Sequence, residues 1–377
     1  MTQEPSLAAR HLTILHLVGA TEDNGGILSV IRNLASVSGR LGWNHVTWVR
    51  EGYKETRRPH LAYLHSRHLW NEHVNHAALF WGGFRACFEL RDLLRRQRFD
   101  VIHAHSRGGF VTAFLACAML KRNVLFTNHA YARRTGLYRY ATRFSRFHTT
   151  VLTPNMARHY GLERSEKSVS VISECCADEC FLGPLSRGGR GEEIRMVGLG
   201  NVLPWKKWDL VVEAMGLMTP EERSRFSVEI YGPTPDMDEA RRYRSGLEER
   251  IRACGLEDRF RLMGSTSEVG KVLDGADWFV LPSTNEPCSV ALIEALAAGV
   301  PGLVSASGGN VDIIEEGRTG LLFKPDDVAD LKRRMLEAVA RRSGMVEAGV
   351  IRQSVRHRSA TSVLEQFEPL YRRVAGG

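Results

Sequence analysis

The sequence lacks the long apolar runs that membrane-spanning helices need. No segment approaches the roughly 18–20 uninterrupted apolar residues of a transmembrane helix, and the longest candidate, residues 76–90, is interrupted by Arg85 and Glu89. The first residues, MTQEPSLAARH, contain no apolar core of the kind that a secretory signal peptide carries. We therefore expect a cytoplasmic protein.

Cysteine is scarce, and its spacing excludes the usual structural uses of this residue. Seven cysteines in a chain of 377 residues are an odd number, which argues against a disulfide framework. Cys175, Cys176 and Cys180 cluster, but no histidine or second cysteine pair follows at zinc-site spacing. The sequence also has no G-x-G-x-x-G segment, so it carries no dinucleotide fingerprint. We expect no metal site.

Acidic residues are under-represented in the first half of the chain. Residues 1–185 contain 24 Lys and Arg against 14 Asp and Glu, and 13 of the 14 histidines lie there. This asymmetry predicts a basic N-terminal domain that faces an anionic partner. No recognised nucleic-acid-binding module is present, so we expect an anionic membrane surface or a phosphorylated lipid acceptor rather than nucleic acid. A solvated basic face without a partner is the alternative.

Strand-like and helix-like segments alternate twice along the chain, which predicts an α/β protein with two domains. Short apolar runs at 12–18, 45–49, 99–105 and 124–127 begin the first half, and runs at 194–198, 228–231, 260–263 and 278–281 belong to the second. Between them, residues 173–190 are rich in Gly and Ser and form a plausible linker. We predict domains over 1–180 and 181–357, with a C-terminal helix over about 358–377 that packs on the first. Residues 51–76 are polar without a clear period, and we expect a surface excursion there.

The most informative stretch runs from Trp278 to Phe323. An apolar run ending at Leu281 predicts a buried strand, and a loop and a helix follow before Gly299 and Pro301. Glu294 is flanked by apolar residues in that helix, so we expect a buried carboxylate that needs hydrogen-bond donors. Glu286 lies in the loop at the carboxyl end of the strand, the edge where open α/β sheets bind ligands.

This block resembles an element of the retaining glycosyltransferases of family four, the glycosyl transferases of group 1. Their pattern is roughly PS-x-x-E-x-x-(G/S)-x-x-x-x-E-A-x-A-x-G-x-P, followed by a GG turn and G-x-x-G. The matching residues of this chain are Pro282, Ser283, Glu286, Ser289, Glu294, Ala295, Ala297, Gly299, Pro301, Gly308, Gly309, Gly317 and Gly320. FDVIHAHS and TNHAY in the first half support the same resemblance.

The resemblance implies a GT-B fold, in which two Rossmann-like domains with parallel sheets face each other across a deep cleft. It implies a retaining, metal-independent hexosyltransferase that uses a UDP- or GDP-linked sugar as donor and needs no cofactor. The expected acceptor is a lipid-linked saccharide or another cell-envelope glycan precursor, at the inner face of the membrane. Two alternatives remain open: a nucleotide-sugar epimerase of the same two-domain shape, and a non-catalytic nucleotide-sugar-binding protein.

Site residues follow from the same resemblance. The predicted catalytic residues are His129, at the end of a strand, and Glu286, which meets the donor sugar. Glu294 is expected to accept hydrogen bonds from the ribose hydroxyls. The predicted donor-binding residues are Gly25, Gly26, Asn201, Lys206, Lys207, Pro287, Cys288, Ser289, Val290 and Glu294.

Within this set, Asn201 departs from the family pattern. Lys206 matches the lysine that binds the donor phosphates, but Asn201 stands where its companion arginine is expected. An amide has neither the charge nor the fork geometry of a guanidinium. Lys207 is a candidate to compensate, and the backbone N–H groups of Gly25 and Gly26 can approach an anion at a helix start.

Two further groups complete the sequence predictions. Acceptor-side residues are expected among His105, Arg107, Arg133 and Arg134. Asp236 and Asp238 have the D-x-D spacing that binds a metal–diphosphate in a different glycosyltransferase fold. Because this pair follows two prolines and leads into a charged helix, we expect helix capping rather than metal binding.

Overall fold

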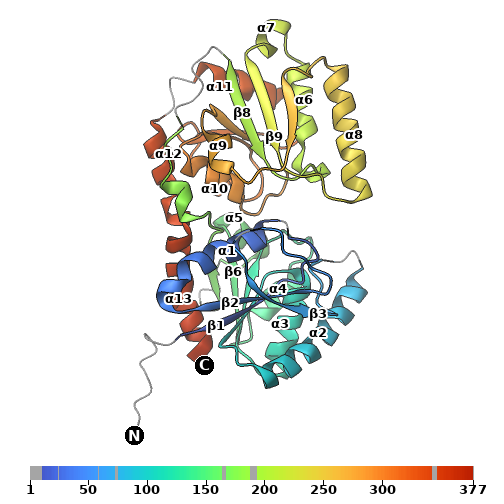
Figure 1. The fold of residues 1–377 in the computed structure, drawn as a ribbon, viewed down its shortest axis with the longest axis vertical. Coiled ribbons are helices and arrows are strands. Elements are labelled where there is room, and N and C mark those ends of the chain that lie inside the picture. Colours follow the sequence, from blue (N-terminus) through green and yellow to red (C-terminus); the bar gives the residue numbers. More distant parts are fainter. Residues whose placement is uncertain are drawn as a thin grey trace. The chain divides into compact units, whose positions relative to one another are not determined.

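Two parallel β-sheets organise the chain (Figure 1). The structure is a computed structural model that describes residues 11–23, 25–57, 59–72, 75–163, 167–186, 193–341 and 346–376. Unit 1 comprises Met1–Cys175 and Ala360–Gly377, and unit 2 comprises Cys176–Ser359. The last helix of the chain therefore belongs to the first unit.

Unit 1 contains a seven-stranded parallel sheet in the order β3-β2-β1-β4-β5-β6-β7. Its strands are β1 (Thr13–Leu17), β2 (Asn44–Arg50), β3 (Ala62–Ser66), β4 (Val101–Ala104), β5 (Val124–Asn128), β6 (Phe147–Val151) and β7 (Val169–Val171). Its helices are α1 (Gly26–Ser38), α2 (His76–Arg96), α3 (Arg107–Met119), α4 (Gly136–Ala141), α5 (Pro154–Tyr160) and α13 (Ala360–Gly376).

Strand β3 corrects the prediction of an irregular excursion over residues 51–76. This strand pairs in parallel with β2, with Val46 opposite Ala62. It lies at the edge of the sheet and most of its side chains are exposed or half-buried, so its sequence lacks the apolar run that marks an inner strand. Backbone hydrogen bonds to β2 hold this strand in the sheet, and such bonds leave no periodic pattern in the sequence.

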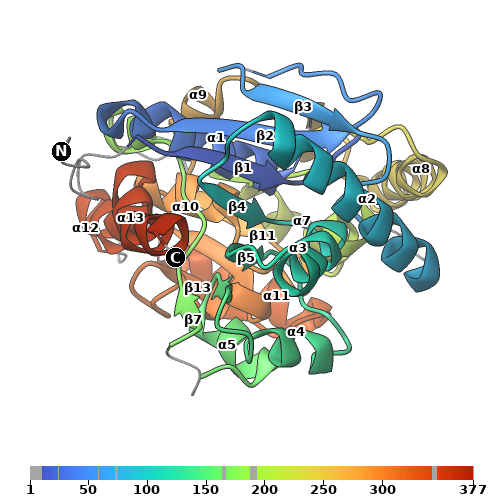
Figure 2. The ribbon, with the colours of Figure 1, turned by 90° about the horizontal axis from the view of Figure 1, so that it is seen from below.

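The two faces of the unit 1 sheet differ in chemistry. One face carries an apolar core that includes Leu15, Leu17 and Ile102 and packs against α2 and α3. The other face carries buried histidine and threonine side chains, including His16, His103 and Thr127. Helix α13 covers part of this polar face, and Figure 2 shows it on the side of the sheet opposite α3.

Unit 2 contains a six-stranded parallel sheet in the order β10-β9-β8-β11-β12-β13. Its strands are β8 (Ile194–Leu199), β9 (Phe226–Tyr231), β10 (Phe260–Gly264), β11 (Trp278–Leu281), β12 (Gly302–Ser305) and β13 (Gly320–Phe323). Its helices are α6 (Trp208–Gly216), α7 (Pro220–Arg223), α8 (Asp238–Ala253), α9 (Val269–Leu273), α10 (Val290–Ala297), α11 (Val328–Ala340) and α12 (Ala348–Ser354).

The predicted fold class, two Rossmann-like α/β domains with parallel sheets, is confirmed. In each sheet the strand order reverses at one point, between β1 and β4 in unit 1 and between β8 and β11 in unit 2. Ligands of open α/β sheets bind beside the carboxyl ends of the strands at such a reversal. The candidate site residues are therefore sought in the loops that leave these four strands.

None of the described helices combines the length and the apolar character that crossing a membrane requires.

Close backbone contact between β12 and β13 yields a stability prediction. A Cβ atom added to Gly320 would lie 2.1 Å from the carbonyl oxygen of Gly302 on the paired strand. We expect Gly320→Ala to lower the free energy of unfolding by about 1–3 kcal/mol, the usual effect of overpacking. Gly246→Ala is the control, because its new methyl group meets open space within α8 and should stabilise by about 0.4–1 kcal/mol. Urea titrations followed by circular dichroism measure both, and equal effects would contradict the packing argument.

Candidate active site

Lys206 and Glu286 meet at the strand-order reversal of unit 2. Lys206 ends a short 3-10 turn, Pro204–Lys206, in the loop after β8, and Glu286 lies in the loop after β11. Lys206 Nζ donates to Glu286 Oε2 at 2.8 Å, and both side chains are buried. Ser283 Oγ donates to the same carboxylate oxygen at 2.8 Å. The structure thus brings a predicted donor-binding residue into direct contact with a predicted catalytic residue.

Two glycines make room for these groups. A Cβ atom on Gly308 would lie 2.2 Å from the Glu286 carbonyl oxygen, and Gly308 has a φ of +59°. Gly309 N donates to that same carbonyl oxygen at 2.8 Å. Gly232, directly after β9, lies against the loop that carries Lys206. A Cβ atom on Gly232 would lie 2.0 Å from the carbonyl oxygen of Gly200 in that loop. Both loops therefore approach neighbouring backbone more closely than a side chain would permit.

Glu294 is less buried than its apolar neighbours predict. Helix α10 buries Leu292, Ile293 and Ala295, whereas Glu294 and Val290 are half-buried on another side of the helix. The expectation of a helix apolar on nearly every side is therefore corrected: the helix is short and presents one partly open face. Glu294 is therefore a half-buried residue on that face.

The other predicted donor-binding residues of unit 2 have identifiable contacts. Ser289 is the N-cap of α10, and its Oγ accepts a hydrogen bond from Leu292 N at 3.2 Å. Cys288 is buried and its Sγ lies 3.7 Å from Nη1 of Arg358. Pro287, next to it in the chain, is half-buried.

Asn201, which stands where the family pattern has an arginine, and the two lysines after it lie in the loop that follows β8. The carbonyl oxygen of Asn201 accepts a hydrogen bond from Trp208 Nε1 at 3.1 Å. Lys207 has a φ of +57° and forms an ion pair with Asp326 at 3.0 Å. Lys207 is thus engaged with an acidic residue, whereas Lys206 Nζ also lies 4.2 Å from the centre of the Trp205 ring.

The D-x-D pair interacts with one arginine. Arg241 forms ion pairs with both Asp236 and Asp238 at the start of α8. The helix N-cap is Met237, which makes no side-chain capping bond, so the prediction that this pair caps the helix is wrong; Asp238 instead places acidic charge in the first turn.

In unit 1, Gly25 and Gly26 lie at the exposed start of α1. Gly25 is the N-cap with a φ of +85°, and, its chain neighbours aside, no atom of the described residues lies within 4 Å of the position of a Cβ. Free space and N–H groups at a helix start suit an anion. The sequence predicted this arrangement, but not the network that holds the loop.

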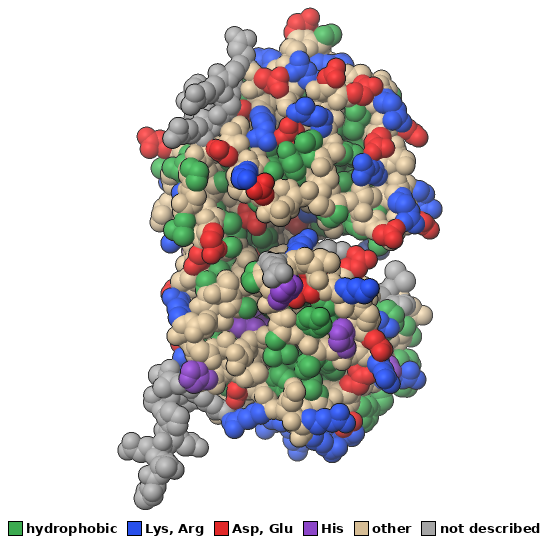
Figure 3. Space-filling model, viewed as in Figure 1, with side chains coloured by type: hydrophobic (Ala, Val, Ile, Leu, Met, Phe, Trp, Pro, Cys, Tyr) green, Lys and Arg blue, Asp and Glu red, His purple; other side chains and the backbone are tan. Residues whose placement is uncertain are grey.

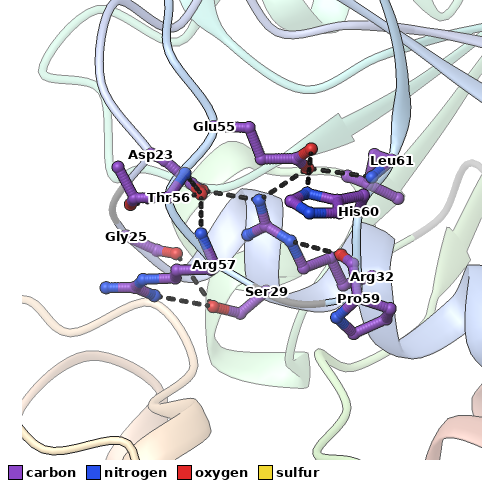
Figure 4. A network of polar contacts seen from close by, with 10 residues as sticks. All are labelled: Asp23, Gly25, Ser29, Arg32, Glu55, Thr56, Arg57, Pro59, His60 and Leu61. Atoms are coloured by element: carbon purple, nitrogen blue, oxygen red, sulfur yellow. Dashed lines mark hydrogen bonds and ion pairs between the residues drawn. The ribbon is translucent and has the colours of Figure 1, made fainter.

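That network is centred on Arg32 of α1 (Figure 4). Arg32 Nη2 contacts Asp23 Oδ1 at 2.7 Å and Glu55 Oε1 at 3.2 Å, with all three side chains buried. Asp23 Oδ2 also accepts from the amides of Thr56 and Arg57, at 2.8 and 2.7 Å. The loop before α1 and the loop after β2 are therefore joined to the helix through buried charges.

The network lowers the pKa of its carboxyl groups. Burial by itself raises the pKa of Asp23, but the hydrogen bonds from the Thr56 and Arg57 amides and from Arg32 outweigh burial, and the net pKa is lowered. Glu55 behaves in the same way, with the Leu61 amide and His60 among its donors. Because both carboxyls have a lower pKa when folded, the stabilisation is present at neutral pH and is lost as the pH falls through about 4 and below.

His129 follows β5, as predicted, and it belongs to a buried polar group. Its Nδ1 lies 2.8 Å from Glu174 Oε1, and its Nε2 lies 3.0 Å from Nδ1 of His105. The His129 side chain is 7% exposed. His105, predicted on the acceptor side, is buried with both ring nitrogens in hydrogen bonds, the second to His16.

Sequence reasoning missed Glu174, His16 and His45 as members of this group. A signal was available, because histidine and threonine recur at alternate positions in neighbouring strands, as in the segments VIHAH and FHTTV. Alternate residues of a strand share one face. The recurrence therefore indicated a polar sheet face.

The predicted acceptor-side arginines lie nearer the surface. Arg133 and Arg134 are exposed in the segment between β5 and α4. Arg107, at the start of α3, forms an ion pair with Glu72 at 3.7 Å.

Two family models match the chain in succession. Glycosyltransferase Family 4 matches residues 24–171, and Glycosyl transferases group 1 matches residues 187–348. The two matches fall in unit 1 and unit 2 respectively.

Among characterised relatives, the chain is 25% identical over 307 residues to 2-deoxystreptamine N-acetyl-D-glucosaminyltransferase of Niallia circulans. That match covers 73% of this chain and 74% of the relative. Mannosylfructose-phosphate synthase of Agrobacterium fabrum is 30% identical over 200 residues, covering 50% of this chain and 43% of the relative.

Solved structures share the fold at low identity. Sucrose-phosphate synthase from Thermosynechococcus elongatus superimposes with a TM-score of 0.78 at 18% identity, covering 97% of this chain and all (100%) of the other. Anabaena HepE in complex with UDP-glucose gives a TM-score of 0.69 at 14% identity, covering 96% and 99%. These similarities support the GT-B fold.

The buried arginine network provides a stability prediction with an internal control. Replacing Arg32 by Met removes the cation but leaves two buried carboxylates, so we expect a loss of about 3–5 kcal/mol in unfolding free energy at pH 7. Arg40→Met removes the same charge from an exposed pair with Glu365, whose side chains are 49% and 58% exposed, and should change stability by less than about 1 kcal/mol. Chemical denaturation of both variants checks the difference, and a mild Arg32 variant would refute the role of the network.

Proposed function

Since this chain belongs to the group 1 glycosyl transferases, family four, we propose that it transfers a sugar from a nucleoside-diphosphate sugar to an acceptor hydroxyl. Transfer retains the anomeric configuration and uses no metal. The observation that carries this proposal is the buried Lys206–Glu286 pair at the β8/β11 edge, in the middle of the family-matched region. Relatives named as glycosyltransferases and a fold neighbour bound to UDP-glucose favour the same donor class, with UDP or GDP as the nucleotide.

Lys206 is the proposed phosphate ligand. An ammonium group has three donors, of which one is directed to Glu286, so the others can bind diphosphate oxygens. Asn201 contributes no charge, and Lys207 is paired with Asp326. In the loop after β8, the Lys206 ammonium would therefore be the main side-chain charge that attracts the donor phosphates.

Glu294 is the proposed ribose ligand. Glu294 is half-buried on the partly open face of α10, and its two carboxylate oxygens are suited to two vicinal hydroxyls. The start of α10, with Pro287, Cys288, Ser289 and Val290, would then lie beside the phosphates, where N–H groups favour an anion.

Glu286 is held in a way that favours contact with the donor sugar over nucleophilic attack. Its Oε2 accepts hydrogen bonds from both Lys206 and Ser283, which stabilise the charge on that oxygen. We therefore favour direct front-face transfer. The bond from the anomeric carbon to the diphosphate oxygen breaks, the bond to the acceptor oxygen forms on the same face, and the acceptor proton passes to the leaving diphosphate. His129 orients the transferred sugar and is not the base.

The proposed acceptor is a lipid-linked saccharide or another envelope glycan precursor at an anionic membrane surface. Residues 101–162 contain nine Lys and Arg and no acidic residue. Arg133, Arg134 and Arg139 are exposed there, and α2 exposes Phe80 and Trp81. Separately, Figure 3 shows further Lys and Arg side chains, which it does not label, along the lower edge of the face of unit 1 that it draws. Basic and aromatic side chains together suit a membrane interface.

The test of the function is turnover against a panel of UDP- and GDP-sugars with lipid-linked saccharide acceptors. Release of nucleoside diphosphate with an acceptor glycosylated in the donor's anomeric configuration supports the proposal. An isomerised sugar nucleotide would identify an epimerase, and binding without turnover a non-catalytic protein. Loss of turnover on adding EDTA would overturn the metal-independent mechanism.

Glu294→Ala tests the donor site. The variant loses two hydrogen bonds to a charged acceptor, each contributing about 1.5–3 kcal/mol, so we expect donor affinity to fall at least tenfold in calorimetry. Glu239→Ala, an exposed position in the first turn of α8, should bind the donor like the parent protein. Unchanged affinity in Glu294→Ala would show that the ribose lies elsewhere.

The membrane proposal predicts salt-dependent binding to anionic vesicles. The protein should sediment with phosphatidylglycerol vesicles and not with phosphatidylcholine vesicles, and 0.5 M NaCl should release it. Because each basic side chain contributes about 1 kcal/mol near such a surface, the double reversal Arg133→Glu/Arg134→Glu should weaken binding more than tenfold. The matched reversal Arg242→Glu/Arg252→Glu, on two exposed positions of α8, should not. Equal binding to both vesicle types would refute the membrane partner.

A further inference from the structure

A line of four histidines ends at Glu174 inside unit 1. The line starts at His45 on β2, continues through His16 on β1 and His105 after β4, and reaches His129 after β5. Each histidine offers one ring nitrogen to the next. The four residues lie far apart in the sequence and meet because their strands are neighbours in the sheet.

The distances between successive atoms are those of hydrogen bonds. His45 Nδ1 lies 2.8 Å from His16 Nε2, and His16 Nδ1 lies 2.8 Å from His105 Nε2. His105 Nδ1 lies 3.0 Å from His129 Nε2, and His129 Nδ1 lies 2.8 Å from Glu174 Oε1. The ring planes of His16 and His45 are 11° apart with centroids at 5.1 Å. Nearly coplanar rings with such close nitrogens meet edge to edge, as an in-plane N–H···N bond requires.

The imidazoles of His45, His16 and His105, the first three of the line, are neutral at pH 7. Burial, assisted by the neighbouring histidines, holds the pKa of His16 and of His105 well below the ordinary value. Burial also lowers the pKa of His45 to about 4. A neutral imidazole has one N–H donor and one bare acceptor nitrogen. Each link of the line therefore needs one donor and one acceptor, and the choice at one end determines every other link.

Glu174 determines that choice. A carboxylate oxygen without a proton only accepts, so a His129 ring with a single proton carries it on Nδ1 and leaves Nε2 bare. The bare Nε2 accepts from Nδ1–H of His105, whose own Nε2 then accepts from Nδ1–H of His16. By the same step His45 carries its proton on Nδ1. All four rings thus adopt the same tautomer, with every N–H pointing toward Glu174.

The far end of the line supports the same direction. His45 Nε2 is buried and has no hydrogen-bond partner in the described part of the chain. In the direction set by Glu174 this nitrogen is a bare acceptor. In the opposite direction it would be an N–H donor buried without a partner, and orphaned donors of that kind are the rarer of the two in proteins. The partners at both ends of the line, Glu174 and the unpartnered His45 Nε2, thus indicate the same direction for the N–H groups.

Geometry disfavours a metal in the same place. His16, His103 and His105 lie close enough together to suggest an ion site. Two nitrogens bound at about 2.0–2.1 Å to one tetrahedral zinc ion are roughly 3.3 Å apart, longer than the 2.8 Å between His16 and His105. Both nitrogens of His103 also have partners, the hydroxyls of Tyr371 and Thr127, at 2.9 and 2.7 Å.

We propose that Glu174 is the positioning residue of this unit and that, through a one-directional chain of His129, His105, His16 and His45, it fixes all four as Nδ1–H tautomers. The segment that carries Glu174 is itself anchored, because Asn33 of α1 donates to the carbonyl oxygen of Cys175 at 3.1 Å. Reversing the direction of the hydrogen bonds along the histidine line requires one added proton at His45 Nε2. Each ring would pass its Nδ1 proton to the next Nε2, and the last proton would reach Glu174.

The consequence for catalysis rests on the proposed sugar transfer, whereas the tautomer assignment does not. Within unit 1 both nitrogens of His129 are occupied, so its ring is held rigidly in one orientation and neither nitrogen is free to take an acceptor proton. This agrees with the proposal that His129 is not the base. Glu174 acts on the reaction through His129 alone.

Nuclear magnetic resonance of the full-length protein with ¹⁵N-labelled histidine tests the assignment. Long-range ¹H–¹⁵N spectra distinguish a protonated ring nitrogen from a bare one. At pH 7 we expect His16, His45, His105 and His129 to show protonated Nδ1 and bare Nε2. Protonated Nε2 in these residues would overturn the proposal, as would a doubly protonated His129. One equivalent of bound metal in the purified protein, with these resonances shifted by it, would also overturn it.

The Glu174→Gln variant tests whether Glu174 fixes the tautomers and whether that affects turnover. Glutamine keeps the shape but can both donate and accept, so the single direction is lost and we expect mixed tautomers at His129 and His105. The turnover number should fall at least tenfold while the donor KM stays unchanged, because Lys206 and Glu294, the proposed phosphate and ribose ligands, lie in unit 2 and do not contact Glu174 through the histidine line. Glu179→Gln, an exposed carboxylate nearby in sequence, should match the parent protein in both readouts.

The two arms separate the possible failures. If the wild-type tautomers are as expected but no sugar nucleotide is turned over, the tautomer assignment of the histidine line is supported and the proposed function is wrong. If Glu174→Gln keeps the four Nδ1–H signals and full turnover, Glu174 is not the positioning residue. Should Glu174→Gln not fold, the wild-type spectrum alone still decides the tautomer assignment.

Discussion

Buried charge must be paired, and this constraint shapes both units. Glu286 is matched by Lys206 and Arg32 by Asp23 and Glu55, whereas Glu174 accepts a hydrogen bond from His129 Nδ1. Each of these groups joins segments that are far apart in sequence. Removing either partner would leave a charge in a medium that stabilises it poorly. The loops that would carry the chemistry are thus positioned by electrostatic necessity as much as by apolar packing.

The sheet of unit 1 satisfies a related constraint in a less common way. Parallel sheets are covered on both faces and usually bury apolar side chains on each. Here one face is apolar, whereas the other buries imidazoles and hydroxyls that bond to one another across five strands. Such a network is most stable when its members are satisfied, and in the histidine line every ring nitrogen except His45 Nε2 has a partner among the described residues. The agreement between the two ends of the line gives the network a direction, which an apolar face cannot have.

Local features were predictable from the sequence. The strand, loop and helix around Glu286 depend on residues within a few positions, and the capping role of Ser289 and the stop at Gly299 follow from the same short-range rules. The edge strand β3 was missed because it lacks an apolar run and is held by backbone pairing with β2. The exposure of Glu294 was misjudged because composition around a residue does not reveal which side of a short helix faces a neighbour.

The sequence by itself determined the fold class, the family resemblance and the identity of the candidate residues, because apolar periodicity and motif spacing are short-range properties. Only the tertiary structure decided which of those residues touch. Lys206 and Glu286 are 80 residues apart, and the histidine line joins residues separated by 29, 89 and 24 positions. Contacts of this kind depend on the order of strands in a sheet, which spacing along the chain does not encode. The sequence therefore named Glu286, Lys206 and His129, and the structure assigned each of them its partner.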